Sequence, residues 1–103
     1  MAEAEFRKVA RVEEIPPGTI RAVQAGEEEI AIANVGGEFF ATQHHCLHLK
    51  GPLGDGRLEG KTLSCPWHGW QYDVQTGRNE FDHEIRLQTF EVRVEDGDVK
   101  IAL

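Results

Sequence analysis

Two short groups of cysteine and histidine are the residues of this chain best suited to chemistry. The sequence has only two cysteines and five histidines, and both cysteines are followed closely by a histidine, in CLH at 46–48 and CPWH at 65–68. Thiolates and imidazoles are the usual protein ligands of zinc and of iron in clusters. Two side chains of one short loop can reach the same centre, and a hairpin-like return of the chain brings the second pair opposite. The spacing therefore predicts a four-ligand metal site built from Cys46, His48, Cys65 and His68.

The donor set by itself leaves two kinds of centre open. A tetrahedral zinc ion and an iron-sulfur cluster both use cysteine and histidine, so ligand types alone do not separate them. His44 and His45 precede the first group and are alternative ligands, although a role as polar residues flanking the loop is the simpler interpretation. His83 stands apart from both groups and is expected to be exposed.

The residues around the two groups extend the pattern well beyond the four donors. Glycine follows each group, at Gly51 and Gly69, and allows the tight backbone that wraps a small inorganic group. The further matching residues are Gly51-Pro52-Leu53, Gly56, CPWHGW at 65–70, Tyr72-Asp73 and Thr76-Gly77. With them the chain resembles the Rieske [2Fe-2S] proteins, in particular the Rieske ferredoxins of bacterial ring-hydroxylating oxygenase systems.

The resemblance implies one [2Fe-2S] cluster per chain and a role for each ligand. Cys46 and Cys65 would hold the inner iron through thiolates, and His48 and His68 would hold the outer iron through ring nitrogens. Because two neutral imidazoles replace two thiolate anions, an added electron is repelled less than in a four-thiolate cluster. The implied cofactor is therefore a one-electron carrier with its histidine side nearest to solvent.

Residues that differ from the high-potential members of the family indicate the reduction potential. Gly51 and Trp67 occupy the places of their second cysteine pair, so no disulfide braces the two loops. Trp70 replaces a serine that donates a hydrogen bond to sulfur, whereas the tyrosine donor is retained as Tyr72. Fewer donors stabilise the reduced charge less, which predicts a potential in the lower part of the Rieske range of about −150 to +300 mV.

The function that the resemblance implies is electron transfer, and not catalysis by this chain itself. A flavoprotein reductase would oxidise NAD(P)H and reduce the ferredoxin, which would then dock transiently through its histidine tip on a terminal oxygenase. The implied protein is cytoplasmic and monomeric. Two alternatives are the small Rieske-like subunit of a nitrite reductase, which often lacks the cluster ligands, and a zinc module with two cysteine and two histidine ligands.

Composition and charge exclude other classes of partner. The chain has 103 residues, with 11 basic against 18 acidic side chains and a net charge of −7, which is the wrong sign for nucleic acid or anionic lipid. Residues 1–10 are charged and carry no apolar core, so we expect neither a signal peptide nor a membrane anchor. Residues 43–72 sum to +1 and the rest to −8. The acidity is thus expected to steer the carrier toward basic partners.

The pattern along the chain is all-β. Short apolar segments alternate with glycine, proline and aspartate, without apolar residues at helical spacing. We expect about eight strands, at 6–12, 19–25, 30–35, 38–42, 62–65, 71–74, 90–95 and 99–103, with a tight hairpin at Gly36-Gly37 and a loop over 43–60.

The resemblance implies one Rieske domain over 1–103: an antiparallel β-sandwich with a small cluster-binding lobe (about 43–72) formed by two loops. Many relatives cover the cluster with a proline loop, which is missing here, so we expect 78–84 to cover it, through Phe81.

Overall fold

The computed structural model describes residues 6–45, 52–66, 70–82 and 84–102, and these form an all-β protein. The elements are β1 (Phe6–Arg11), η1 (Val12–Glu14), β2 (Ile20–Ala25), β3 (Glu28–Val35), β4 (Glu38–Gln43), η2 (Leu53–Asp55), β5 (Arg57–Glu59), β6 (Thr62–Ser64), β7 (Gln71–Asp73), β8 (Thr89–Phe90), β9 (Val92–Glu95) and β10 (Asp98–Ala102), where η denotes a 3-10 turn. None of the helical segments in the described ranges has the length and apolar character needed to cross a membrane.

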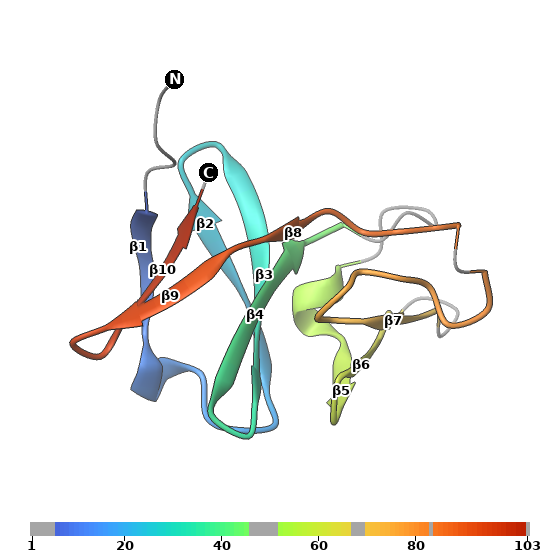
Figure 1. Ribbon diagram of the computed structural model, residues 1–103, viewed down its shortest axis with the longest axis horizontal. Helices are drawn as coiled ribbons and strands as arrows, with labels where there is room; N and C mark the ends of the chain where they lie inside the picture. The colour runs from blue at the N-terminus through green and yellow to red at the C-terminus, as the bar shows by residue number, and fades with distance from the viewer. Residues whose placement is uncertain (1–5, 46–51, 67–69, 83, 103) are drawn as a thin grey trace.

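The strands form three antiparallel sheets that lie one after another across the molecule (Figure 1). We call them the terminal sheet (β1-β10-β9), the central sheet (β2-β3-β4-β8) and the lobe sheet (β5-β6-β7). The first two are the predicted sandwich, and the predicted all-β antiparallel fold is confirmed. The lobe differs from the expectation of two loops alone, because it contains a small sheet of its own.

Strand β3 is the centre of the structure because it is buried on both faces. Residues 30–34 are all buried, whereas a strand at the surface of a sandwich alternates between buried and exposed residues. Ile30 and Ile32 join an apolar cluster that reaches the terminal sheet at Val99 and Ile101.

The opposite face of β3 carries small residues and supports the lobe. Ala31 and Ala33 belong to a second buried cluster, together with Leu53, Leu63 and Cys65 of the lobe. Alanine has almost no side chain to separate two layers, so the lobe packs close against the central sheet.

The hairpin between β3 and β4 is confirmed. Val35 pairs with Glu38 across Gly36 and Gly37, whose φ angles are 62° and 100°. Such positive φ values are easily reached only by glycine. The Gly37 amide also donates to Oδ1 of Asn34 at 2.7 Å, which fixes the turn.

Two of the strand predictions are wrong in detail. The alternating segment 90–95 is not one strand, because it ends its pairing with β4 at Phe90 and begins pairing with β10 at Val92. The chain crosses here from the central to the terminal sheet, and Val94 is 47 % exposed. The expected loop over 43–60 contains η2 and β5, and β5 pairs with β6 over Arg57–Glu59.

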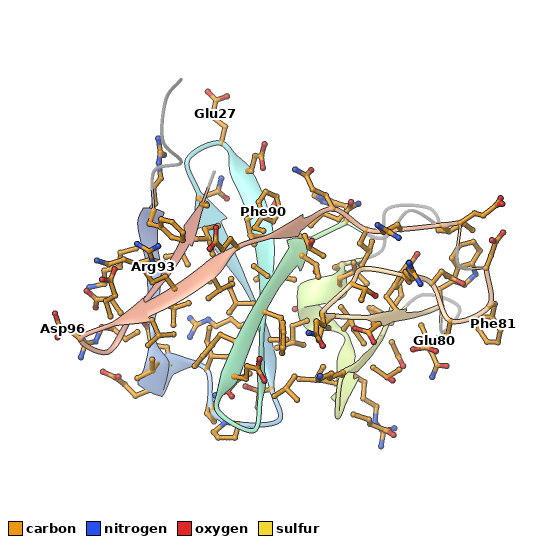
Figure 2. The ribbon with its side chains drawn as sticks, viewed as in Figure 1. Glu27, Glu80, Phe81, Phe90, Arg93 and Asp96 are labelled. Carbon is orange, nitrogen blue, oxygen red and sulfur yellow. The ribbon has the colours of Figure 1, made fainter. Side chains whose placement is uncertain are left out.

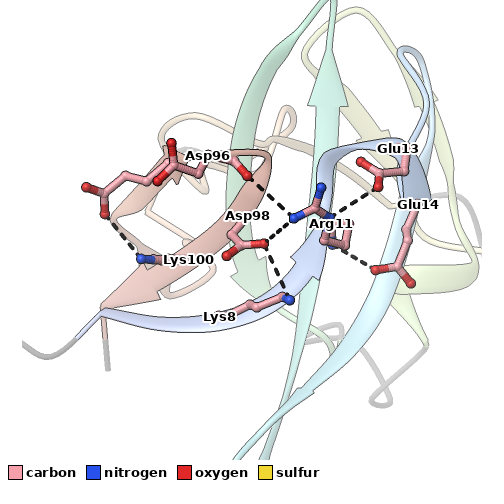
Figure 3. Close-up of polar contacts among 8 residues, drawn as sticks. Lys8, Arg11, Glu13, Glu14, Asp96, Asp98 and Lys100 are labelled. Carbon is pink, nitrogen blue, oxygen red and sulfur yellow. Dashed lines mark hydrogen bonds and ion pairs between the residues drawn. The ribbon is translucent and has the colours of Figure 1, made fainter.

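A group of charged side chains joins β1 to β10 (Figure 3). Asp98 accepts from Arg11 Nη1 at 2.8 Å and pairs with Lys8 Nζ at 3.4 Å, and Arg11 Nε donates to Glu13 at 3.1 Å. Partial burial by itself would raise the pKa of Asp98, but the hydrogen bonds from Arg11 and Lys8 outweigh it and lower that pKa. The ionised carboxylate is therefore the form that the folded protein stabilises.

Replacing Asp98 tests this contribution through its pH dependence. A carboxyl group whose pKa is lowered by folding stabilises the fold above its unfolded pKa of about 3.9, and this contribution is lost as pH falls through the lower folded value. We expect Asp98→Asn to be less stable than wild type at pH 7, with the difference shrinking below about pH 4. Urea unfolding between pH 7 and pH 2.5 measures it.

Asp96→Asn is the matched control for that series. It removes a neighbouring carboxylate, and asparagine suits the left-handed backbone of this position, where φ is 52°. Equal pH dependence in wild type and Asp98→Asn would contradict the assignment.

Candidate metal centre

Of the four predicted ligands, Cys65 lies in the described part of the chain, and Cys46, His48 and His68 lie outside it. Cys65 directly follows β6 and is 2 % exposed. Its amide donates to the carbonyl of Trp70 at 2.7 Å, one step beyond the Ser64–Gln71 pair of β6 and β7. The second ligand loop therefore begins and ends on one antiparallel ladder.

The base of the first ligand loop is closed in a similar way. His45 and Pro52 form an antiparallel bridge, and the Leu53 amide donates to the carbonyl of His44 at 2.7 Å. The Gly54 amide then donates to Nδ1 of His44 at 3.1 Å. These hydrogen bonds fix both ends of the first ligand loop, where it leaves β4 and where it returns at η2.

The turn η2 connects these two loop bases because it is pressed between β2 and β6. A Cβ atom on Gly54 would lie 2.6 Å from Cβ and 2.8 Å from the amide nitrogen of Ala22 in β2. A Cβ atom on Gly56 would overlap the carbonyl oxygen of Ser64, the residue before Cys65. Only glycine permits both approaches, so these two positions set how closely the turn lies to Cys65.

Two aromatic side chains pack in or against the buried cluster that contains Cys65. Tyr72 is fully buried beside Leu53 and Leu63, and the half-buried Trp70 packs against this cluster. Trp70 and Tyr72 therefore contribute to the apolar packing of the lobe around Cys65. Trp67 lies outside the described residues.

The segment after β7 returns along the lobe and ends in an ordered turn. The Glu80 amide donates to the carbonyl of Gln71 at 2.9 Å, and Oδ1 of Asn79 accepts from the amides of Phe81 and Asp82 at 2.8 and 2.9 Å. Phe81 is 80 % exposed and projects from one end of the molecule (Figure 2). This exposure disagrees with the expectation that the Phe81 side chain covers the cluster, because the turn directs its ring toward solvent.

The described side chains fit a cluster held between two loops. The cysteine thiol sits in an apolar, water-poor setting, at the point where two closed loop bases meet across η2. Such a setting excludes solvent from an iron-sulfur centre, while backbone amides near the loop bases are the usual donors to its sulfurs. Among the described residues, no three His, Cys, Asp or Glu side chains gather into a different metal site.

Comparison with known proteins agrees with this description. The pattern of the Rieske [2Fe-2S] domain family matches residues 5–91. Ferredoxin CarAc of Metapseudomonas resinovorans is 37 % identical over 97 residues, covering 92 % of this chain and 91 % of its own. The ferredoxin component of biphenyl 2,3-dioxygenase from Rhodococcus jostii is 36 % identical, covering 93 % and 91 %.

A solved structure of similar sequence gives the same fold. The ferredoxin chain in a complex of reduced oxygenase and oxidised ferredoxin of carbazole 1,9a-dioxygenase superposes with a TM-score of 0.86. It is 35 % identical, and the match covers 97 % of this chain and 94 % of that one.

The close approach at Gly56 yields a stability prediction. Gly56→Ala forces a methyl group against the Ser64 carbonyl, and we expect a loss of about 2–3 kcal/mol in the free energy of unfolding, measured with urea. Gly60→Ala is the control: its φ is 58° but its Cβ would meet open space, so we expect only about 1 kcal/mol. A smaller loss for Gly56→Ala than for Gly60→Ala would contradict the packing described for η2.

Proposed function

The chain belongs to the Rieske [2Fe-2S] domain family, and from this premise we propose that it carries single electrons to the terminal oxygenase of a ring-hydroxylating dioxygenase system. The family assignment implies one [2Fe-2S] cluster per chain, which takes up and releases one electron when bound. Like the ferredoxin components that it resembles, the chain is an electron-transfer component and not an enzyme.

For the ligands we propose the assignment that the sequence predicts. Cys46 and Cys65 hold the inner iron, and His48 and His68 hold the outer one. The burial of Cys65 and the closed bases of both loops support this proposal, because together they hold one thiol away from water beside the return of the first loop. The single observation that carries the proposal is the position of Cys65 at this junction.

The proposed partner is supported by the relatives. The carbazole 1,9a-dioxygenase ferredoxin, 35 % identical, has been solved in complex with its oxygenase. We place docking at the same end of the molecule as Phe81, since the Glu80–Gln71 hydrogen bond joins the turn of Phe81 to the base of the second ligand loop. On the reducing side we propose a flavoprotein reductase.

The charged residues near Phe81 indicate what kind of surface the partner needs. Glu80, Asp82 and Glu84 are all exposed within three residues of Phe81 in the chain, and the exposed Arg78 and Arg86 flank them. We call Glu80, Asp82 and Glu84 the acidic collar of Phe81; they outnumber the two arginines, so this segment adds negative charge that the sum over residues 43–72 does not include. Its partner surface should be an apolar recess with a basic rim.

Three further parts of the proposal rest on the relatives and the composition. We propose a cytoplasmic monomer and a single Rieske domain over residues 1–103; the domain proposal is supported by the family pattern over residues 5–91 and by the 91 % coverage of the ferredoxin relatives. A zinc module is disfavoured by the family assignment. A nitrite reductase subunit is disfavoured because all four predicted ligands are retained.

Replacing the histidine ligands tests the ligand assignment. We expect His48→Ala and His68→Ala to lose most of the bound iron and sulfide and the EPR signal of the dithionite-reduced protein, since each removes a ligand of the outer iron. His45→Ala, which changes an exposed neighbour, should keep both. A wild-type protein that is colourless and contains zinc would overturn the proposed function.

Docking is tested by electron transfer from the reduced protein to the terminal oxygenase of the carbazole 1,9a-dioxygenase system, followed by stopped flow. We expect Phe81→Ala to lower the second-order rate constant by about tenfold, as for an anchor residue in a protein interface. Added salt should lower the wild-type rate, because the acidic collar steers association.

Val94→Ala is the matched control for docking, since Val94 is the other large exposed apolar residue in the part of the chain that the structure describes and lies on β9, away from the lobe. Its rate should equal that of wild type. Equal losses in both variants, or a rate indifferent to salt, would argue against the proposed surface.

A further inference from the structure

His44 is buried although it lies in a polar loop sequence. It follows β4 directly and is 7 % exposed. Nδ1 accepts the hydrogen bond from the Gly54 amide at 3.1 Å, so the ring hydrogen is on Nε2. Nε2 lies 3.7 Å from Oε2 of Glu29 in β3. Nδ1 thus has a buried hydrogen-bond partner, and Nε2 faces the half-exposed carboxylate of Glu29.

The Gly54 amide depends on this acceptor. The hydrogen bond is buried, and Ala22 packs against Gly54 so closely that η2 has no space to move toward β2. A buried amide without a partner costs free energy comparable to a lost hydrogen bond. Without Nδ1 of His44, the turn would have to shift away from β2 to expose this amide to water.

A shift of η2 would displace the bases of both ligand loops. Pro52 and Leu53, at the start of the turn, end the first loop through their pairing with His45 and His44. Gly56, at the end of the turn, lies against Ser64, next to Cys65. The imidazole, the turn and the two loop bases therefore form one continuous contact path.

We propose that His44 is a positioning residue for the [2Fe-2S] cluster: its Nδ1 fixes η2, and η2 fixes the spacing of the two ligand loops. His44 is then neither an iron ligand nor a simple flanking residue. This inference rests on the proposed function, because it assumes that the loops hold a cluster.

The chemistry of the side chain provides a sharp test. Oδ1 of asparagine is the same number of bonds from the backbone as Nδ1 of histidine, whereas Oε1 of glutamine is one bond further. Asparagine can therefore accept the Gly54 hydrogen bond with little rearrangement, and glutamine cannot. If burial of a polar side chain alone mattered, the two amides would behave alike.

The experiment compares His44→Asn, His44→Gln and His44→Ala with wild type, and uses His45→Ala as the neighbouring control. Each purified holoprotein is assayed for iron and sulfide per chain, for the EPR g values after dithionite reduction and for the half-life of its visible absorption in the presence of an iron chelator. We expect His44→Ala and His44→Gln to lose the cluster about tenfold faster, with shifted or broadened g values. His44→Asn and His45→Ala should stay within about twofold of wild type.

The outcomes separate this inference from the function that it assumes. A wild-type protein without iron and sulfide overturns the proposed function. A wild-type protein with a cluster, and variants with unchanged g values and lifetimes, overturns only the role of His44. Equal impairment of the asparagine and glutamine variants also overturns it, even where His44→Ala does not fold.

Discussion

The absence of side chains at Gly54 of η2 and at Gly56, which directly follows it, is the constraint on which the cluster lobe depends. Gly54 lies directly against Ala22 of the central sheet, and Gly56 lies directly against the backbone of β6. The three-residue turn η2 is therefore held against the central sheet on one side and, through the following glycine, against the lobe sheet on the other. Because the first ligand loop ends at this turn and the second begins directly after β6, these two packing contacts set the position of one loop relative to the other.

The layers beneath the turn are arranged so that this contact can form. Strand β3 directs isoleucines toward the terminal sheet and alanines toward the lobe, so the large residues fill the sandwich and the small ones admit the lobe. Cys65 then lies within the apolar cluster formed on the alanine face. Charged groups lie at both ends: Glu80 and Phe81 are at the opposite end of the molecule from Asp96, which is close in sequence to the ion-paired Asp98 (Figure 2). A buried redox centre and an exposed, charged docking end are both consistent with a carrier that binds its partners briefly.

The features that local chemistry determines could be predicted from the sequence. Gly36-Gly37 specifies a hairpin because only glycine readily adopts two successive positive φ values. The two cysteine-histidine groups predict a metal site through donor type and spacing, and of its four residues the described part of the chain contains Cys65. Features that arise from distant contacts could not. The break at Glu91 reflects a change of sheet, which alternation of apolar residues does not reveal, and β5 exists through its pairing with β6. His44 resembles any polar loop residue until the fold places Gly54 beside its ring.

Hydrogen exchange of the cluster-loaded protein, followed by mass spectrometry, tests most directly whether η2 joins the two loop bases into one rigid unit. The account predicts that peptides covering 52–57 and 62–65 exchange as slowly as those covering β3 and β4, because their amides would open only when the central sheet does. Fast exchange at 52–57, with β3 and β4 still protected, would show that the turn opens independently and would contradict the claim that it positions both ligand loops.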